Sequence, residues 1–290
     1  MQSISLGATR LHDDSERCDG SHNRACSWLQ HNGRLPTNVG RTGGMRRRSP
    51  DLMPSELAAR SGGAKTEAMI ELPFRNRAEA GRVLARELRA FADRPDVVVL
   101  GLPRGGVVVA FEVAEDLHVP LDVMVVRKLG VPGQEEVALG AVSTGGVRVL
   151  DHGLIATLEI PAEIIEALSG KERAEVERRE GLYRGDRPPI KVSGKVAILV
   201  DDGIATGSTT RAAVTALRQQ TPARIIVAAP VAPACVCEEL RRQVDQLVCL
   251  AQPENFFAVG QWYWDFSQTG DDEVRDLLHR ASRAGAGRAA

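Results

Sequence analysis

Short apolar runs of strand length recur along this chain, and segments with helical periodicity lie between them. The runs occupy residues 97–101, 121–127, 195–200, 223–231 and 244–250. A strand that is apolar at nearly every position has both of its faces buried, and helices between the strands supply that cover. The pattern therefore predicts an α/β fold in which a parallel sheet is flanked by helices on both faces.

Helix signals fill the intervals between these runs. Asn76 and Glu79 have the spacing of a capping box at a helix start. The apolar face of that helix is expected to consist of Val83, Leu84, Leu88 and Phe91. Further helices are expected at residues 107–117, 208–220 and 235–243, with a longer one beginning at Pro161. Between the second apolar run and Pro161, a loop at 128–136 is expected to lead into a strand or hairpin.

Composition and charge exclude several classes of protein. The 290 residues are 43% hydrophobic, enough for one domain with a sizeable core. No apolar run approaches the roughly 18 residues of a membrane-spanning helix, and the first residues lack the apolar run of a secretory signal. The five cysteines have no metal-binding spacing, so reduced thiols and a cytoplasmic location are expected. A net charge of −1 gives no general reason to expect a nucleic acid or membrane partner.

Residues 1–68 differ in composition from the rest of the chain. They are rich in Ser, Gly, Asn and Arg and show no sustained period of a helix or strand. Such a composition predicts a disordered tail, and the folded domain is predicted at residues 69–290. Two alternatives stay open, namely a functional basic arm around Arg46–Arg48 and a mis-assigned start codon. In the latter case the true start would be Met45, Met53 or Met69.

Deletion of residues 1–68 is expected to leave the melting temperature and the ligand affinity of the protein unchanged within experimental error. A segment of this composition adds little to a hydrophobic core. Differential scanning calorimetry of the truncated and full chains checks the expectation. A melting temperature lowered by several degrees would show instead that the segment packs on the domain.

The segment 195–210, KVAILVDDGIATGSTT, joins a buried strand to a helix start through a loop of small residues. Small residues let backbone N–H groups approach a phosphate, and a helix N-terminus favours its negative charge. Asp201 and Asp202 would repel a phosphate, but their carboxylates are natural acceptors for the two hydroxyls of a ribose. The motif therefore predicts a site for a phosphorylated ribose. The alternative is a capped helix with two solvated aspartates.

This motif resembles the signature of the type I phosphoribosyltransferases, in which four apolar residues and two acids precede a loop of the form Ala-Thr-Gly-Gly/Ser-Thr. The resemblance covers roughly residues 74–283 and implies the family's fold, a parallel α/β core with a small C-terminal hood element. It assigns ribose hydroxyls to Asp201 and Asp202 and the 5′-phosphate to the loop that follows. The residues implied in binding ribose 5-phosphate are Asp201, Asp202, Ala205, Thr206, Gly207, Ser208 and Thr209.

The resemblance extends to LPRGG at residues 102–106, which is similar to the family's pyrophosphate loop. It implies pyrophosphate contacts from Arg104, Gly105 and Gly106, and a cis peptide bond between Pro103 and Arg104. An ordinary strand-to-helix turn is the alternative. Arg127 and Lys128 are expected at the end of the second strand. The resemblance implies that they contact the pyrophosphate, and the alternative is that they are ordinary surface charges.

Two more segments correspond to parts of the family pattern. Residues 129–146 match the position of the mobile catalytic loop, and Glu135 and Glu136 in it are either loop acids that close on the site or solvated charges. Residues 253–266 follow the last apolar run, where the family has the hood that selects the acceptor. The segment is loosely similar to that of the hypoxanthine-guanine enzymes, with one extra residue, and implies base binding by Phe256.

The implied reaction moves a 5-phosphoribosyl group from its 1-pyrophosphate to an acceptor such as a nucleobase. Asp201, Asp202 and Arg104 are the implied catalytic residues. Mg²⁺ is the implied cofactor, held near Asp201 and Asp202 indirectly, through substrate and water. The expected partners are small-molecule substrates, and a homodimer is one open alternative for the oligomeric state.

A second class of protein stays open. A regulator that senses phosphoribosyl pyrophosphate without turning it over would carry the same site. A phosphotransfer or nucleotide-hydrolysing enzyme is a third alternative, but the loop lacks the Gly-Lys-Ser/Thr of a Walker A motif.

Overall fold

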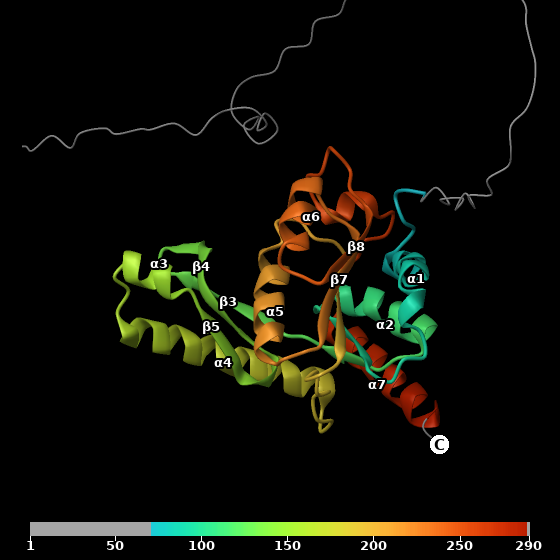
Figure 1. Ribbon diagram of the computed structural model, residues 1–290, viewed down its shortest axis with the longest axis horizontal. Coiled ribbons are helices and arrows are strands. Elements are labelled where there is room, and N and C mark those ends of the chain that lie inside the picture. Colours follow the sequence, from blue (N-terminus) through green and yellow to red (C-terminus); the bar gives the residue numbers. More distant parts are fainter. Residues whose placement is uncertain (1–70, 289–290) are drawn as a thin grey trace, which may run out of the picture. The chain divides into compact units, whose positions relative to one another are not determined.

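The computed structural model describes the backbone of residues 71–288, and the side chains of that range except residues 135–136 and 285–288. The predicted tail at residues 1–68 lies outside the described part of the chain. Figure 1 shows the arrangement of the helices and strands.

The core is a sheet of five parallel strands in the order β2-β1-β6-β7-β8. These strands are β1 (Val97–Gly101), β2 (Leu121–Val123), β6 (Val196–Val200), β7 (Arg224–Val231) and β8 (Gln246–Ala251). Every residue of β1, β2 and β6 is buried, which explains why these runs are apolar at every position except Asp122 of β2. The predicted parallel sheet is confirmed.

Helices cover both faces of this sheet, as the sequence predicts. One face packs against α1 (Arg77–Glu87), α2 (Gly105–Leu117) and α7 (Asp271–Arg288). The other face packs against α5 (Ser208–Gln219) and α6 (Ala234–Arg241). The N-cap role of Asn76 is confirmed, because its side chain accepts a bond from the Glu79 amide at 3.0 Å. The Glu79 carboxylate accepts from the Arg75 amide at 2.6 Å, one residue before the Asn76 amide that a capping box would use.

The apolar run at 121–127 is not one strand, which corrects the sequence prediction. Strand β2 ends at Val123. Its neighbour β1 ends at Gly101, and side chains form hydrogen bonds with both the N–H and the C=O of Val123. The Val123 amide donates to Asp122 at 2.7 Å, and its carbonyl accepts from Arg184 at 2.8 Å. The chain then enters a second sheet, and Met124 and Val125 stay buried as it crosses.

The second sheet is antiparallel, in the order β3-β4-β5. It contains β3 (Val126–Val131), β4 (Gln134–Ser143) and β5 (Val147–Leu150), with the short helix η2 (Thr144–Gly146) before β5. The predicted loop at 128–136 is therefore wrong, since only residues 132 and 133 lie between β3 and β4. The predicted strand that follows is confirmed by β4. Hydrogen bonding between the strands outweighs the preference of the Gly and Pro residues in this segment for turns.

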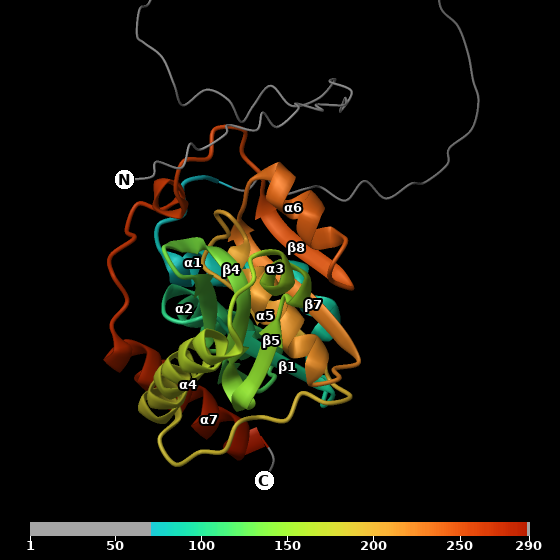
Figure 2. The same cartoon turned by 90° about the vertical axis from the view of Figure 1, so that its left-hand side faces the viewer.

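Helix α4 (Ala162–Arg184) and helix α5 pack against the second sheet. Helix α3 (His152–Thr157) follows β5, and Figure 2 shows α3, β4 and β5 facing the viewer. The remaining short helices are η1 (Arg89–Phe91) and η3 (Val259–Trp262). None of the helices within 71–288 is long and apolar enough to cross a membrane.

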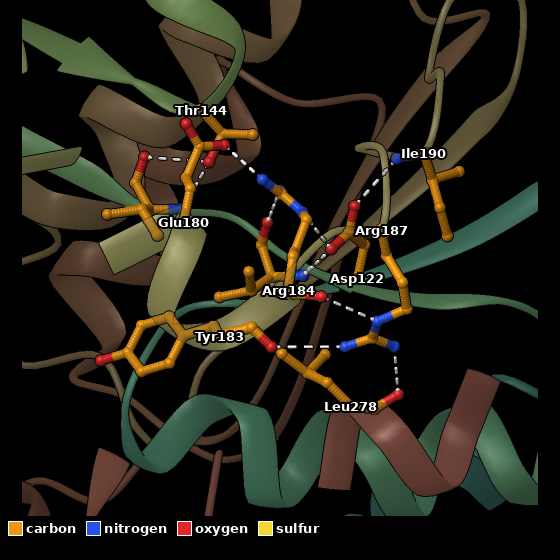
Figure 3. Close-up of polar contacts among 10 residues, drawn as sticks. Asp122, Thr144, Glu180, Tyr183, Arg184, Arg187, Ile190 and Leu278 are labelled. Carbon is orange, nitrogen blue, oxygen red and sulfur yellow. Dashed lines mark hydrogen bonds and ion pairs between the residues drawn. The ribbon is translucent and has the colours of Figure 1, made fainter. Parts of the chain in front are cut away.

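A buried ion pair joins β2 of the first sheet to α4, the helix that packs on the second sheet (Figure 3). Arg184, at the end of α4, donates to Asp122 Oδ1 at 2.8 Å, and a second bond links it to Glu180 one turn earlier. Arg184 is 7% exposed and Asp122 is 6% exposed. The other carboxylate oxygen of Asp122 accepts from the Ile190 amide at 2.9 Å. Neither charge is left without partners, as burial requires.

Candidate functional site

The loops after β1 and β6 are in direct contact at the carboxyl edge of the parallel sheet. The Leu102 amide donates to the Val200 carbonyl at 2.9 Å, which brings LPRGG beside the end of β6. A Cβ atom on Gly105 would lie 1.9 Å from Asp202 Oδ2, and one on Gly106 would lie 3.1 Å from Asp201 Oδ1. Gly105 is therefore required because the Asp202 carboxylate packs against its backbone. Gly106 is required because the Val200 carbonyl and the Asp201 Cα would lie 2.9 and 3.0 Å from its Cβ. Asp201 and Asp202 form the acid pair.

The loop after the acid pair ends at the first turn of α5. Ile204 is buried, and its amide donates to the Val231 carbonyl at 2.9 Å, whereas Ala205 and Thr206 are exposed. Gly207 has φ 72°, in the left-handed region, and α5 begins directly after it at Ser208. The first N–H groups of a helix lack intrahelical acceptors. This loop therefore presents exposed small residues beside the donors of a helix N-terminus, as the sequence predicts.

The acid pair is partly buried and contacts the LPRGG loop and the start of α1. The Asp202 amide donates to Asp201 Oδ1 at 2.9 Å, and Arg77 Nε donates to Asp202 Oδ2 at 2.6 Å. Burial and the charge of Asp202 raise the pKa of Asp201 well above its usual range. Burial also raises the pKa of Asp202, against the lowering effect of Arg77. Ionising both carboxylates is therefore costly even beside Arg77, unless a ligand or a further cation is bound.

Arg104 belongs to the LPRGG loop and directly precedes α2. The Pro103–Arg104 peptide bond is cis, which confirms the expectation drawn from the resemblance. Arg104 Nη1 lies 4.0 Å from Asp271 Oδ1 of α7, and this pair is partly exposed, with the Arg104 side chain 38% exposed. Asp271 also accepts from the buried Tyr183 hydroxyl at 2.7 Å. Burial and this bond raise the pKa of Tyr183 to about 12, so the hydroxyl stays a donor.

The expected position of Arg127 and Lys128 at the end of a core strand is wrong. Both residues lie within β3 of the second sheet, because the chain leaves the first sheet after Val123. Arg127 Nε donates to Glu172 of α4 at 2.7 Å. A role of these two residues at a pyrophosphate stays a prediction. So does the role of residues 129–146 in closing a site, and the side chains of Glu135 and Glu136 are outside the described part.

The hood segment at 253–266 follows β8, as expected, and contacts the loop after β6. The Tyr263 hydroxyl donates to the Asp202 carbonyl at 2.5 Å. A Cβ atom on Gly203 would lie 2.3 Å from Val259, so this glycine allows the close approach of the hood. Phe256 stacks on Trp262, with ring centres 6.3 Å apart. Base binding by Phe256 stays a prediction.

Sequence reasoning missed three residues of this neighbourhood, namely Arg77, Tyr263 and Asp271. Arg77 is 125 positions from Asp202 and Tyr263 is 61 positions from it, so no local pattern links them. A signal for Asp271 was present, because acidic residues open a segment in which Val274, Leu277 and Leu278 recur with helical spacing.

The acid pair provides hard oxygen donors, which suit Mg²⁺. No group of three or more His, Cys, Asp or Glu side chains capable of holding a metal occurs among the described residues. Arg77 already occupies one oxygen of Asp202. The residues therefore fit Mg²⁺ only as a partly hydrated ion whose remaining ligands come from a bound substrate.

The parallel sheet, with these loops at its carboxyl edge, defines the type I phosphoribosyltransferase fold. Residues 74–267 match the model of the phosphoribosyl transferase domain, and the chain belongs to this family. It thus contains a domain of the transferase class of enzymes.

Individual relatives agree with this assignment. Proteins of Mycobacterium tuberculosis strains CDC 1551 and H37Rv, each named "Putative phosphoribosyl transferase", are 47% identical over 210 residues. The match covers 72% of this chain and 47% of each relative, so the chain spans about half the length of these curated relatives. A crystal structure of a protein from Thermus thermophilus is 42% identical, with a TM-score of 0.65, over 71% of this chain and 98% of that one.

Proposed function

We propose that this domain transfers a 5-phosphoribosyl group from 5-phosphoribosyl 1-pyrophosphate to a nucleobase and releases pyrophosphate. The observation that carries the proposal is the contact between the acid pair and the LPRGG loop. Gly105 and Gly106 pack directly against the carboxylates of Asp202 and Asp201. A ribose held by these carboxylates would therefore have its anomeric carbon beside the donors that a pyrophosphate requires.

Each residue has a distinct task in this proposal. Asp201 and Asp202 accept hydrogen bonds from the ribose hydroxyls, and the backbone of residues 205–209 binds the 5′-phosphate. Arg104 with the amides of Gly105 and Gly106 binds pyrophosphate as its negative charge grows. The protein acts mainly by positioning the ring and stabilising the leaving group. Mg²⁺, when bound beside Asp201 and Asp202, would supply further positive charge to the pyrophosphate oxygens.

The location proposed for this activity is the cytoplasm. Three described cysteines, Cys235, Cys237 and Cys249, are free thiols, as is common in a reducing compartment.

Replacement of Arg104 by alanine is expected to lower turnover more than ribose 5-phosphate binding. The substitution removes a charge-assisted contact worth roughly 1.5–3 kcal/mol, which corresponds to a loss of about 10- to 150-fold in turnover. Ribose 5-phosphate lacks the pyrophosphate, so its affinity, measured by calorimetry, is the internal control. Equal losses of turnover and of ribose 5-phosphate binding would assign Arg104 a structural role and show that LPRGG is not the pyrophosphate loop.

Pyrophosphate release tests the proposed reaction against the alternative of a sensor. The protein is incubated with 5-phosphoribosyl 1-pyrophosphate, Mg²⁺ and a panel of purine and pyrimidine bases, and pyrophosphate is quantified. The proposal predicts base-dependent release with at least one member of the panel. Tight binding of 5-phosphoribosyl 1-pyrophosphate without release in the presence of any base would favour a sensor.

A further inference from the structure

Arg77 joins three elements that are distant in the sequence. From the first position of α1, its Nε donates to Asp202 Oδ2 at 2.6 Å, and its Nη1 donates to the Ser267 carbonyl at 2.8 Å. The guanidinium carbon lies 3.8 Å from the centre of the Phe266 ring. The start of α1, the loop after β6 and the end of the hood segment therefore meet on one guanidinium.

The ion pair between Arg77 and Asp202 is shielded from solvent. The Arg77 side chain is 11% exposed and that of Asp202 is 15% exposed. A Cβ atom on Gly105 would lie 2.6 Å from Arg77 Nε as well as 1.9 Å from Asp202 Oδ2, so both groups pack on the backbone of the LPRGG loop. Little room is left for either side chain to rotate. The carboxylate of Asp202 therefore has a fixed orientation, with Oδ2 held by Arg77.

The hood segment holds Asp202 by a second route. The Tyr263 hydroxyl donates to the backbone carbonyl of Asp202 at 2.5 Å. The Tyr263 ring stacks on Phe266, with centres 5.0 Å apart, and Phe266 is the ring beneath Arg77. Asp202 is thus held through its side chain by Arg77 and through its backbone by Tyr263, and both of these residues contact Phe266. A displacement of Asp202 must be shared with the hood.

We propose that Arg77 is a positioning residue, which fixes the carboxylate of Asp202 for a ribose hydroxyl and couples that carboxylate to the acceptor side of the site through Phe266 and Ser267. The inference rests on the proposed function, since it takes Asp202 as a ribose ligand. It assigns Arg77 no contact with the reacting atoms. The proposal has two consequences that can be tested separately. The positive charge beside Asp202 should support the affinity for the ribose, and the planar guanidinium, which also reaches the hood, should couple the ribose site to the hood.

Affinity for ribose 5-phosphate tests the first consequence. Calorimetry without Mg²⁺ is expected to show that Arg77→Gln weakens binding at least tenfold, whereas Arg77→Lys, which keeps the charge, stays within about threefold of the unchanged protein. Arg82→Gln is the matched control. It lies on the same helix, in a more exposed pair with Glu112, and is expected to bind normally. In a protein that already carries Asp202→Asn, the addition of Arg77→Gln is expected to weaken ribose 5-phosphate binding by less than about twofold.

Tryptophan fluorescence tests the second consequence. The chain has three tryptophans, and a Trp28→Phe background leaves Trp262 and Trp264 of the hood segment as reporters. Ribose 5-phosphate is expected to change their emission. A lysine at position 77 cannot bond to Asp202 and to the Ser267 carbonyl at once, as the arginine guanidinium does. In Arg77→Lys the emission change is therefore expected to fall by at least half, while the affinity for ribose 5-phosphate is kept. Loss of affinity and of emission change in equal measure would overturn the coupling role, because it would show that the two effects are not separable.

The outcomes separate this inference from the proposed function. If the unchanged protein fails to bind ribose 5-phosphate at saturating concentration, the proposed function is overturned, and the role of Arg77 with it. If the unchanged protein binds and Arg77→Gln binds equally well, only the inference about Arg77 is overturned. Should Arg77→Gln fail to fold, Arg77→Lys decides the matter. An emission change equal to that of the unchanged protein would then overturn the coupling to the hood.

Discussion

The double replacement Asp201→Asn/Asp202→Asn is expected to weaken the binding of 5-phosphoribosyl 1-pyrophosphate tenfold or more, which is about 1.4 kcal/mol. Carboxylates accept hydrogen bonds from hydroxyls more strongly than amide oxygens do. An asparagine at position 202 also loses the ion pair with Arg77 that orients the side chain. Calorimetry in the presence of Mg²⁺ measures the change. Unchanged affinity in the double variant would show that these acids do not bind the ribose.

A stability measurement on the single variant Asp201→Asn separates a role of Asp201 in binding from a role in folding. The pKa of Asp201 in the native protein is raised by burial and by Asp202, so stability is lost as the pH rises from the unfolded pKa through the native one. An asparagine has no proton to lose. The single variant Asp201→Asn is therefore expected to melt at or above the temperature of the unchanged protein at pH 8, although it binds the ligand more weakly. A lower melting temperature would assign Asp201 a structural role.

Replacement of Arg184 by methionine is expected to destabilise the protein by about 3–5 kcal/mol, because it leaves Asp122 buried without its counter-charge. In a domain of this size that corresponds to a melting temperature lowered by roughly 6–20 °C. Both side chains of the pair are less than 10% exposed, at 6% and 8%. The pair also sits where the chain crosses from one sheet to the other, so its loss affects both (Figure 3).

Arg178→Met on the same helix is the control for Arg184. Arg178 pairs with Glu175, and its side chain is 58% exposed. Exposed pairs contribute about 0–1 kcal/mol, so little change is expected. Denaturant unfolding of the two variants gives both values. Equal destabilisation by Arg184→Met and Arg178→Met would contradict the importance assigned to the buried pair.

The parallel sheet could be predicted because burial on both faces makes most positions of its strands apolar. β1 and β6 match the predicted runs to within one residue. The crossing after Val123 could not be predicted, because the run stays apolar at Met124 and Val125, which are buried in core clusters that contain residues of both sheets. Apolar character reports burial, and it does not report which strand is the hydrogen-bonding partner.

The principal loops of the candidate site could also be predicted, because parallel strands bring their carboxyl ends to one edge. The contact of LPRGG with the acid pair follows from that geometry. The contacts of Arg77 and Tyr263 with Asp202 depend on how α1 and the hood pack on the sheet. Side chains brought together only by tertiary packing leave no local pattern in the sequence.

A crystal structure with bound 5-phosphoribosyl 1-pyrophosphate and Mg²⁺ tests the central claim most directly. The account predicts the 5′-phosphate within hydrogen-bond distance of the backbone N–H groups of residues 205–209. It also predicts the ribose hydroxyls on Asp201 and Asp202, and the pyrophosphate against Arg104 and Gly105. A ligand bound elsewhere, or bound in this loop with its hydroxyls turned away from both carboxylates, would contradict it.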